Sequence, residues 1–547
     1  MMRVGTRGRL WLLAGGMAIL CLVVLLGRGA ESRGASAPQK TLRVALGSFP
    51  DYMDPQLSYT FEGWTAMYET YIPLLTYQRA NGRAGAKIVP GLARGLPRVS
   101  DGGRTYTLFL RRGLKYSDGS RVKASDFEYS VKRLLRMYSG GMPFYMVIVG
   151  TREYLRARKG GISGIVADNR TGRIEIRLRR PSGTFPQTLA IPFAAPVPAG
   201  TPMRDRSLDP PPATGPYAFD SVGFRRWTYR RNPAWAGGNG RRMPQLPKGS
   251  ADRIEVHVIR DRDAQVDQVL QGRLDWMVGP PPDRLAELRR DYGGTQLQVE
   301  PNLNIQYFWM NTTEPPFDDL RVREAANYAV DRSVLVGIYD GQLMPTQQIL
   351  PPAMPGYRRF EPFPYDLEKA RRLVAAADPR DRRVTVWVDT EPPHREAAAY
   401  YRDQLQAIGL RAELKVIDSL SYFTAIGNTS KPNLDTGFSN WFADYAHPDD
   451  FFHPMLFGSS ILRFFNGNFA QLSEPALDAR ARRLGRQPLT PRRERAYAAL
   501  DRAYMKHAPW VPYGNFTLPL FVSKRVDLDG VVWNPLVGPD LASFRFD

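Results

Sequence analysis

The stretch that decides the fold is Tyr106 to Leu135, YTLFLRRGLKYSDGSRVKASDFEYSVKRLL, in which a strand and a helix follow each other closely. Residues 106–110 alternate as a strand with one buried face does. Ser125 and Glu128 form a capping-box pair, which predicts that a helix begins there. The apolar residues of one helical face come next: Phe127, Val131, Leu134 and Leu135. The stretch therefore predicts a strand and a helix whose core side is marked.

The same patterns recur along the rest of the chain. Residues 41–46 (TLRVAL) alternate as a strand does, near the start of the body. Further on, residues 384–388 (VTVWV) suit a strand, residues 394–408 a helix that stops at Gly409, and residues 411–416 a second strand. This is a βαβ unit, so we expect a mixed α/β protein.

Length and charge limit the possible classes of protein. With 547 residues and 61.7 kDa the chain is too long for one hydrophobic core, so two or three domains are expected. The formal charge is +21, and residues 1–40 hold six basic side chains and one acidic one, which leaves +16 for the rest. A basic balance is compatible with nucleic acid, an anionic membrane surface or acidic ligands, and it does not choose among them.

The N-terminus indicates export. Three arginines precede the uncharged run Leu10 to Gly27, LWLLAGGMAILCLVVLLG, which is typical of a secretory signal or of an uncleaved membrane anchor. Both leave the body outside the cytoplasm, and residues 35–37 (ASA) offer a cleavage site. The sole cysteine, Cys21, lies inside the apolar run, either as apolar filler or as a lipidation site. We expect an extracytoplasmic protein with no disulfide after residue 40.

Motifs for catalysis or metal binding do not stand out. The chain has no G-x-S-x-G elbow, no H-E-x-x-H, no P-loop and no G-x-G-x-x-G after a strand. The candidates for a metal are His447, Asp449, Asp450 and His453. Their spacing matches no usual zinc site, and Pro448 interrupts the helix that would align them. We expect no enzyme, no metal and no cofactor.

Two basic clusters are candidates for nucleic-acid binding. Residues 224–233 (FRRWTYRRNP) mix arginines with Trp227 and Tyr229, as a stacking platform does, but an exposed strand has the same composition. Residues 477–495 suit the solvated face of a helix. Because export separates the chain from the usual nucleic acids, we expect no nucleic-acid partner.

The segment Ser439 to Phe452, SNWFADYAHPDDFF, concentrates aromatic and acidic residues. Aromatic side chains make rigid apolar walls, and one carboxylate among them would hold an amine, so Asp444 is a candidate ligand-binding residue. The alternative is structural: Trp441, Phe442 and Tyr445 would pack in the core and Asp444 would cap a loop. The residues alone leave both interpretations open.

Several segments, in order, resemble the large extracytoplasmic solute-binding proteins of ABC importers, the peptide/oligopeptide/nickel-binding family. The most specific is the opening stretch, residues 106–135. The others are TGPY (214–217), RRNPAW (230–235), LRVREAANYAVDRSVL (320–335), PPAMPGY (351–357) and APWVPY (508–513). Each is weak alone, but together they span nearly the whole exported chain.

The resemblance implies an α/β fold of the periplasmic-binding-protein type, with two lobes, an extra domain and a ligand cleft between the lobes. The expected domains are a discontinuous first lobe (41–76, 207–300 and 507–547), an extra domain (77–206) and a second lobe (301–506), after the N-terminal segment 1–40. In this family the lobes close over the ligand by a hinge motion.

The resemblance also assigns a site. The segment Ser439 to Phe452 is similar to the family's ligand-cleft segment, so Asn440, Trp441, Phe442 and Ala443 would pair with a peptide backbone, and Asp444 would receive the α-amino group. Tyr445 follows them, and the opposite wall would be Tyr59, Thr60 and Phe61. Asn440 stands where peptide binders usually have glycine, which puts the length and composition of the peptide in question.

The resemblance implies the substrate-binding component of an ABC importer, which captures peptides and delivers them to a membrane permease. We expect a monomer. One alternative is the same fold with a non-peptide solute, such as a metal chelate, a sugar or an opine-like compound. Another is a surface interaction protein whose basic body adheres to anionic lipid or cell wall.

Overall fold

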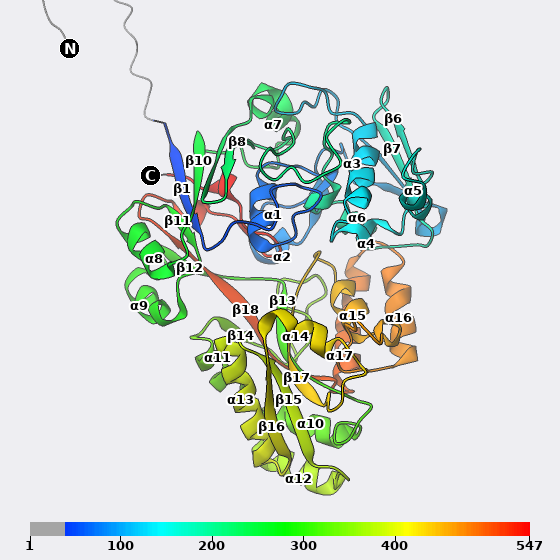
Figure 1. The fold of residues 1–547 in the computed structure, drawn as a ribbon, viewed down its shortest axis with the longest axis vertical. Helices are drawn as coiled ribbons and strands as arrows, with labels where there is room; N and C mark the ends of the chain where they lie inside the picture. The colour runs from blue at the N-terminus through cyan, green and yellow to red at the C-terminus, as the bar shows by residue number, and fades with distance from the viewer. Residues whose placement is uncertain (1–38, 547) are drawn as a thin grey trace, which may run out of the picture. The chain divides into compact units, whose positions relative to one another are not determined.

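The protein is described by a computed structural model, and the description covers residues 39–546 (Figure 1). Lys40–Asp547 form one compact unit. The apolar run Leu10 to Gly27, with Cys21, lies outside the described residues. Within residues 39–546, no helix is both long and apolar enough to cross a membrane.

The backbone of the compact unit is a twelve-stranded mixed sheet. Along its main path the strands are β16 (Arg411–Ile417), β15 (Arg383–Asp389), β17 (Thr436–Phe442), β13 (Asn304–Met310), β18 (Trp510–Val522), β11 (Trp276–Val278), β1 (Thr41–Leu46), β10 (Arg253–Val258), β9 (Arg226–Arg231) and β8 (Tyr217–Gly223). Two more strands, β12 (Leu297–Pro301) and β14 (Leu343–Pro345), pair with β18. The mixed α/β class expected from the sequence is confirmed.

Smaller sheets and the helices complete the fold. One four-stranded sheet has the order β4 (Arg98–Ser100), β5 (Thr105–Phe109), β7 (Arg173–Arg177) and β6 (Ile165–Asp168), and the two-stranded sheets are β2 (Leu75–Tyr77) with β3 (Ile88–Pro90) and β19 (Trp533–Asn534) with β20 (Gly538–Pro539). The helices before β13 are α1 (Phe61–Tyr68), α2 (Gly82–Gly85), α3 (Ser125–Arg136), α4 (Met142–Tyr145), α5 (Thr151–Ala157), α6 (Phe185–Thr188), α7 (Gly240–Arg242), α8 (Arg262–Leu270) and α9 (Pro282–Tyr292). Those after it are α10 (Leu320–Ala329), α11 (Arg332–Ile338), α12 (Leu367–Ala377), α13 (Pro392–Ala407), α14 (Ser419–Ile426), α15 (Asp449–Leu456), α16 (Pro475–Gly485) and α17 (Pro491–Met505).

The strand and helix of the opening stretch form as β5 and α3, but the helix is capped differently from the expectation. Ser125 makes no capping bond to the helix. Instead Asp126 Oδ2 accepts from the backbone N–H of Lys123 at 2.8 Å and from the Tyr116 hydroxyl at 2.9 Å. The Glu128 carboxylate accepts from the N–H of Ile162 and pairs with Lys132. The capping box of Ser125 and Glu128 is therefore wrong, because Asp126 takes the capping role from the next position.

The βαβ unit expected in the C-terminal half is confirmed. β15 and β16 pair in parallel from Arg383 with Arg411 to Asp389 with Ile417, and α13 connects them. Parallel neighbours need such a crossover helix. β17 then pairs with β15, also in parallel, but only at Thr436 and Gly437.

Strand β18 joins the two parts of the large sheet (Figure 1). Its first residues, Trp510 to Gly514, pair with β13, and its last residues, Leu518 to Val522, pair with β11 and β12. Between these ladders the Asn304 amide bonds both backbone groups of Phe516, at 2.7 Å each. On this edge of β18 a side chain thus takes the place of a neighbouring strand, while on the other edge β14 pairs with Gly514 to Phe516.

The core and its buried ions position the segment before α1. Arg133 on α3 forms a fully buried ion pair with Asp54, and its Nη1 also donates to Gln56 Oε1 at 2.9 Å. This holds the loop that leads to Tyr59.

In the basic cluster on β9, Trp227 and Tyr229 are each 1% exposed and pack in the core, so they form no exposed stacking platform.

Candidate ligand-binding site

The candidate segment Ser439 to Phe452 is the end of β17, a bend, and the start of α15. β13 pairs with β17 along its whole length, from Thr436 to Phe442. On the other side of β17, the pairing with β15 ends at Gly437. There the Tyr422 hydroxyl donates to the carbonyl oxygens of Trp387 and Phe438. Beyond this point one main-chain edge of β17 has no strand beside it among residues 39–546.

Side chains near this free edge are only partly covered. Asn440, Trp441 and Ala443 are half-buried, whereas Phe442 is 50% exposed. The N–H of Ala443 donates to Leu303 O at 2.8 Å, in the short link between β12 and β13. Of the three aromatic residues that the structural interpretation places in the core, Trp441 and Tyr445 do pack against it, whereas Phe442 does not.

Asp444 lies just past the strand and faces the segment before α1. Its Oδ1 accepts a hydrogen bond from the Tyr59 hydroxyl at 2.6 Å, between residues 385 apart in the sequence. Its backbone N–H donates to Asp450 Oδ2 at 2.9 Å, and Trp441 Nε1 donates to the same oxygen at 3.2 Å. Asp450, which is 2% exposed, therefore holds the bend that presents Asp444.

Burial shifts the ionisation of this acidic group of residues. It raises the pKa of Asp444 to about 6, against the hydrogen bond from Tyr59, which lowers it. Burial and the neighbouring charge of Asp444 hold the pKa of Asp450 well above its usual value, and burial raises that of Asp449 to about 7. None of the ion pairs within residues 39–546 includes any of the three. Arg180 acts on Asp449, whose pKa it lowers, whereas no basic group offsets the burial of Asp444 and Asp450, so this pair of carboxyl groups is suited to a cation.

The opposite wall expected from the sequence consists of residues with different roles. Tyr59 is 42% exposed, stacks near Trp64 and reaches Asp444. Thr60 caps α1, because its hydroxyl accepts from the N–H of Gly63 and donates to Asp51 Oδ1 at 2.9 Å. Phe61 is half-buried at the start of α1. The structure brings only Tyr59 of these three within hydrogen-bonding distance of Asp444.

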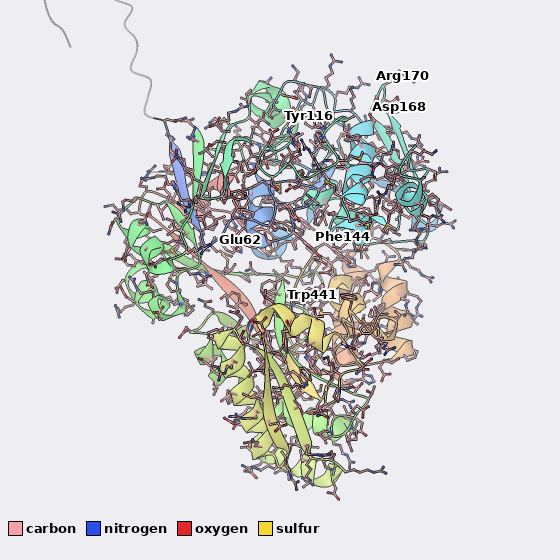
Figure 2. All side chains as sticks on the ribbon, viewed as in Figure 1. Glu62, Tyr116, Phe144, Asp168, Arg170 and Trp441 are labelled. Carbon is pink, nitrogen blue, oxygen red and sulfur yellow. The ribbon has the colours of Figure 1, made fainter. Side chains whose placement is uncertain are left out.

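Two further contacts flank the acidic cluster. The Tyr445 ring meets Phe144 of α4 edge to face, with 6.1 Å between ring centroids. The next N–H, of Ala446, donates to the hydroxyl of the fully buried Tyr77 at 3.1 Å. Figure 2 marks Phe144 and Trp441, which come from the two chain segments that meet here. Sequence reasoning missed Tyr77 and Phe144, and considered Asp450 only as a metal ligand, because no local pattern links these distant positions.

The residues considered for a metal are arranged differently. His447 is fully buried, its Nδ1 accepts from the N–H of Asp449 at 3.1 Å, and burial lowers its pKa to about 3. A neutral imidazole held by a backbone group is a structural element of the bend. In the described part of the chain, no group of three or more His, Cys, Asp or Glu side chains is placed to hold a metal.

The sequence is similar to those of known binding proteins. Heme-binding protein A of Haemophilus influenzae is 26% identical over 90% of this chain and 89% of its own length. The dipeptide-binding protein of Escherichia coli is 25% identical over 82% of this chain and 85% of its own. These relatives are named as binding proteins.

Solved structures share the fold. The chain matches the clavulanic acid biosynthesis oligopeptide binding protein 2 with a TM-score of 0.83 and 25% identity, over 93% of this chain and 96% of that one. An unliganded open form of the periplasmic murein tripeptide binding protein matches with a TM-score of 0.77 and 20% identity, over 93% and 98% of the two chains. The periplasmic-binding-protein fold expected from the resemblance is thereby confirmed.

The family model for bacterial extracellular solute-binding proteins, family 5 (middle region), matches residues 87–462. This range includes α3, β13 and the whole candidate segment Ser439 to Phe452. The match covers more than half of the chain and agrees with the fold. The chain therefore belongs to the bacterial extracellular solute-binding proteins of family 5.

Proposed function

We propose that this protein is the substrate-binding component of an ABC importer and that it captures peptides by their free α-amino group. The observation that carries the proposal is the pair of buried acids Asp444 and Asp450, which no basic group offsets, beside the free edge of β17. Relatives named as dipeptide- and glutathione-binding proteins, and a fold neighbour solved with peptide STSA, support the peptide class.

The α-ammonium of a peptide would replace the Tyr59 hydroxyl as the partner of Asp444. Tyr59 already donates to this carboxylate at 2.6 Å, so a donor fits within hydrogen-bonding distance of it. A cation also neutralises the repulsion between Asp444 and Asp450, which a neutral hydroxyl does not. Unit charges 4 Å apart attract by about 4 kcal/mol at an effective dielectric constant of about 20.

The peptide backbone would add to β17 beyond Gly437. There β17 pairs with β13 on one side only, so its other edge is available for an extended chain. Strand addition takes its affinity from main-chain hydrogen bonds, so it tolerates many peptide side chains. Asn440, Trp441, Phe442, Ala443 and Tyr445 would line this path, with Phe442 and Tyr59 offering exposed aromatic surface.

We further propose that the domains expected from the sequence move as lobes. The continuous strand β18 and the link 302–303 between β12 and β13 connect the two sets of strands, which supports hinge points at Phe516 and at Leu303. This proposal puts the crossing between the lobes inside β18, a few residues after the bound at 507 that the sequence predicts. Because Ala443 bonds to Leu303, a peptide on β17 would act directly on this link.

The proposed role in transport implies a place of action and a membrane partner. The family is described as extracellular, and we propose that the body acts outside the cytoplasmic membrane as a monomer, released or anchored by the segment 1–40, and delivers its ligand to a membrane permease. It performs no chemistry on the ligand. A non-peptide solute is the second candidate, because a relative named as a heme-binding protein matches over most of the chain.

The test is mass spectrometry of the compounds released when protein purified without refolding is denatured. Short peptides that differ in side chains but share free N-termini would support the proposal. Calorimetry then compares a free and an N-acetylated tripeptide on the same protein. Equal affinity for both would exclude the amine role of Asp444, and release of one non-peptide compound would replace the peptide by that solute.

A further inference from the structure

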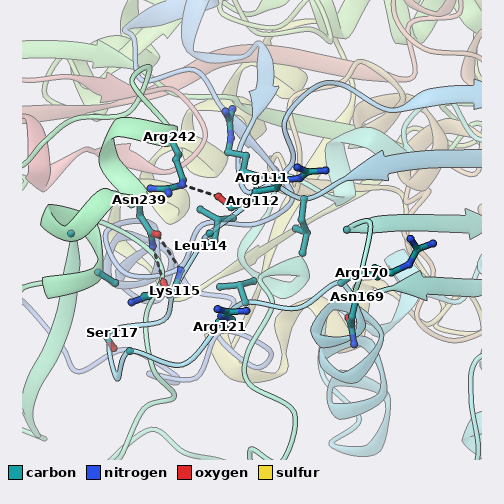
Figure 3. Close-up of a pocket in the computed structure, with 18 of the residues that line it drawn as sticks. Arg111, Arg112, Leu114, Lys115, Ser117, Arg121, Asn169, Arg170, Asn239 and Arg242 are labelled. Carbon is teal, nitrogen blue, oxygen red and sulfur yellow. Dashed lines mark hydrogen bonds between the residues drawn. The ribbon is translucent and has the colours of Figure 1, made fainter.

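A cavity of about 740 Å³ is lined by residues other than those of the Asp444 site (Figure 3). Three segments line it: the turn after β5 (residues 110–124), the turn between β6 and β7 (169–172), and the segment before and within α7 (233–242). None of the residues proposed for the peptide belongs to it. The volume is within the range of about 300–1,000 Å³ that small-molecule sites occupy.

The charge of this cavity is one-sided. Its ionisable lining residues are Arg111, Arg112, Lys115, Arg121, Arg170 and Arg242, and no acidic residue lines it. Not one of these six cations takes part in an ion pair within residues 39–546, although many other arginines of the chain do. The cavity therefore concentrates positive charge, which only the charge of Asp168, acting on Arg170, offsets in part among the described residues next to it in sequence.

The nearest carboxylates in sequence are engaged elsewhere. Asp118 Oδ1 accepts from the N–H and the hydroxyl of Ser120, at 2.9 and 2.6 Å. Asp168 accepts from Thr171 Oγ1 and from the N–H groups of Arg170 and Thr171, which lower its pKa. Both acids thus stabilise their own turns, and neither lines the cavity.

The backbone of the cavity is held by specific contacts; Figure 3 marks those of Asn239 with Lys115 and of Arg242 with Arg112 as dashed lines. The Asn239 side chain bonds both backbone groups of Lys115, accepting at 3.1 Å and donating at 2.7 Å. Arg242 donates through Nε to Arg112 O and through Nη1 to Gly238 O. Gly113 has a φ of +74°, and a Cβ there would lie 2.8 Å from Arg242 Nη2. The positive φ of this turn favours glycine, whereas the end of the flexible Arg242 side chain could move aside.

We propose that this cavity binds a ligand that carries two or more phosphate groups. Arginine side chains suit phosphate oxygens, because the planar fork of a guanidinium group donates two parallel hydrogen bonds to them. Six cations without acids call for a ligand with several negative charges, and a single carboxylate would leave most of them unpaired. Two sources share this chemistry: a soluble polyphosphate compound, or the head groups of an anionic phospholipid surface.

The test uses inorganic triphosphate and the full purified protein in low-salt calorimetry. The pocket variant R112Q/R121Q/R170Q removes three exposed cations whose side chains make no hydrogen bond within the described chain. The control variant R152Q/R372Q/R492Q removes three exposed arginines that make no ion pair within residues 39–546 and lie outside the cavity. We expect the pocket variant to bind triphosphate at least tenfold more weakly and the control variant to stay within twofold of the original protein. An equal loss of triphosphate affinity in the two variants, or no triphosphate binding by the original protein, would overturn the proposal.

A measurement on the unaltered protein guards against misfolding of a variant. Triphosphate should protect Lys115 from an amine-acylating reagent, read by peptide mass spectrometry, while the exposed Lys431 serves as the reference. Protection of both lysines alike, or of neither, would contradict a specific site. D444N should keep its triphosphate affinity, so failure here and failure of the peptide proposal are separate results.

Vesicles distinguish the two sources. Co-sedimentation compares phosphatidylglycerol vesicles with phosphatidylcholine vesicles for the original protein and both variants. Loss of binding to the anionic vesicles in the pocket variant alone would assign the site to a lipid head group. Equal vesicle binding by both variants, with triphosphate binding lost only in the pocket variant, would assign it to a soluble polyphosphate.

Discussion

Replacing Asp444 by asparagine should weaken peptide binding and leave the fold intact. The change removes the negative charge but keeps the size of the side chain and an oxygen that can accept from the Tyr59 hydroxyl. Asp450 still holds the bend, because it bonds the backbone N–H of residue 444 and the Trp441 indole. The variant therefore tests the charge of Asp444 and little else.

The expected size follows from the burial of the site. Loss of one partner from a hydrogen-bonded, buried charge pair costs about 2–5 kcal/mol. The new asparagine side chain keeps one neutral hydrogen bond, and the site is only partly buried, so we expect about 2 kcal/mol, or roughly a thirtyfold weaker Kd. In the absence of ligand, D444N should stabilise the protein: it removes one of two repelling carboxylates, so Tm should rise slightly.

The assay is isothermal calorimetry at pH 7.5 with a free and an N-acetylated tripeptide. The free peptide should lose affinity in D444N, whereas the acetylated peptide should bind weakly and alike to both proteins. The matched control is D529N, an exposed aspartate that makes no ion pair within residues 39–546. A D444N variant that binds the free peptide as tightly as the original would refute the assignment of the amine to this residue.

Three further predictions concern the same region. Binding of free-amine peptides should weaken as pH falls through about 6, where Asp444 takes up a proton. In the ligand-free protein, the raised pKa values of Asp444 and Asp449 contribute stability at low pH, and this stability is lost as pH rises from about 4 to 7. A measurement of Tm against pH checks this direction. Y59F removes a hydrogen bond that lowers the pKa of Asp444, so the pH midpoint of peptide binding should move upward, and an unchanged midpoint would contradict the contact. R133M leaves the buried Asp54 carboxylate unpaired and should lower the free energy of unfolding by about 3–5 kcal/mol in urea titration, whereas R152M, at an exposed arginine, should change it by less than about 0.5 kcal/mol.

Local patterns predicted elements well where one periodicity dominates. β15, α13 and β16 follow the expected ranges closely, because apolar alternation and a helical face are properties of consecutive residues. The cap of α3 was misplaced, because Ser125 and Asp126 are both good capping residues and distant groups such as the Tyr116 hydroxyl and the N–H of Ala199 bind the aspartate. Competition between adjacent residues is settled by tertiary contacts that a local pattern does not contain.

The sequence by itself determined most strands and helices and the α/β class; it also predicts export and, through its resemblance to a family, makes Asp444 the candidate for the amine. The tertiary structure decided which groups meet: Tyr59 reaches Asp444 across 385 residues, and β18 joins two sets of strands. The basic cavity likewise gathers cations from three segments, none of which has a sequence pattern that predicts a binding site. The physical reason is that secondary structure depends on neighbours in the chain, whereas charge compensation and burial depend on distances in space, which only the folded chain defines.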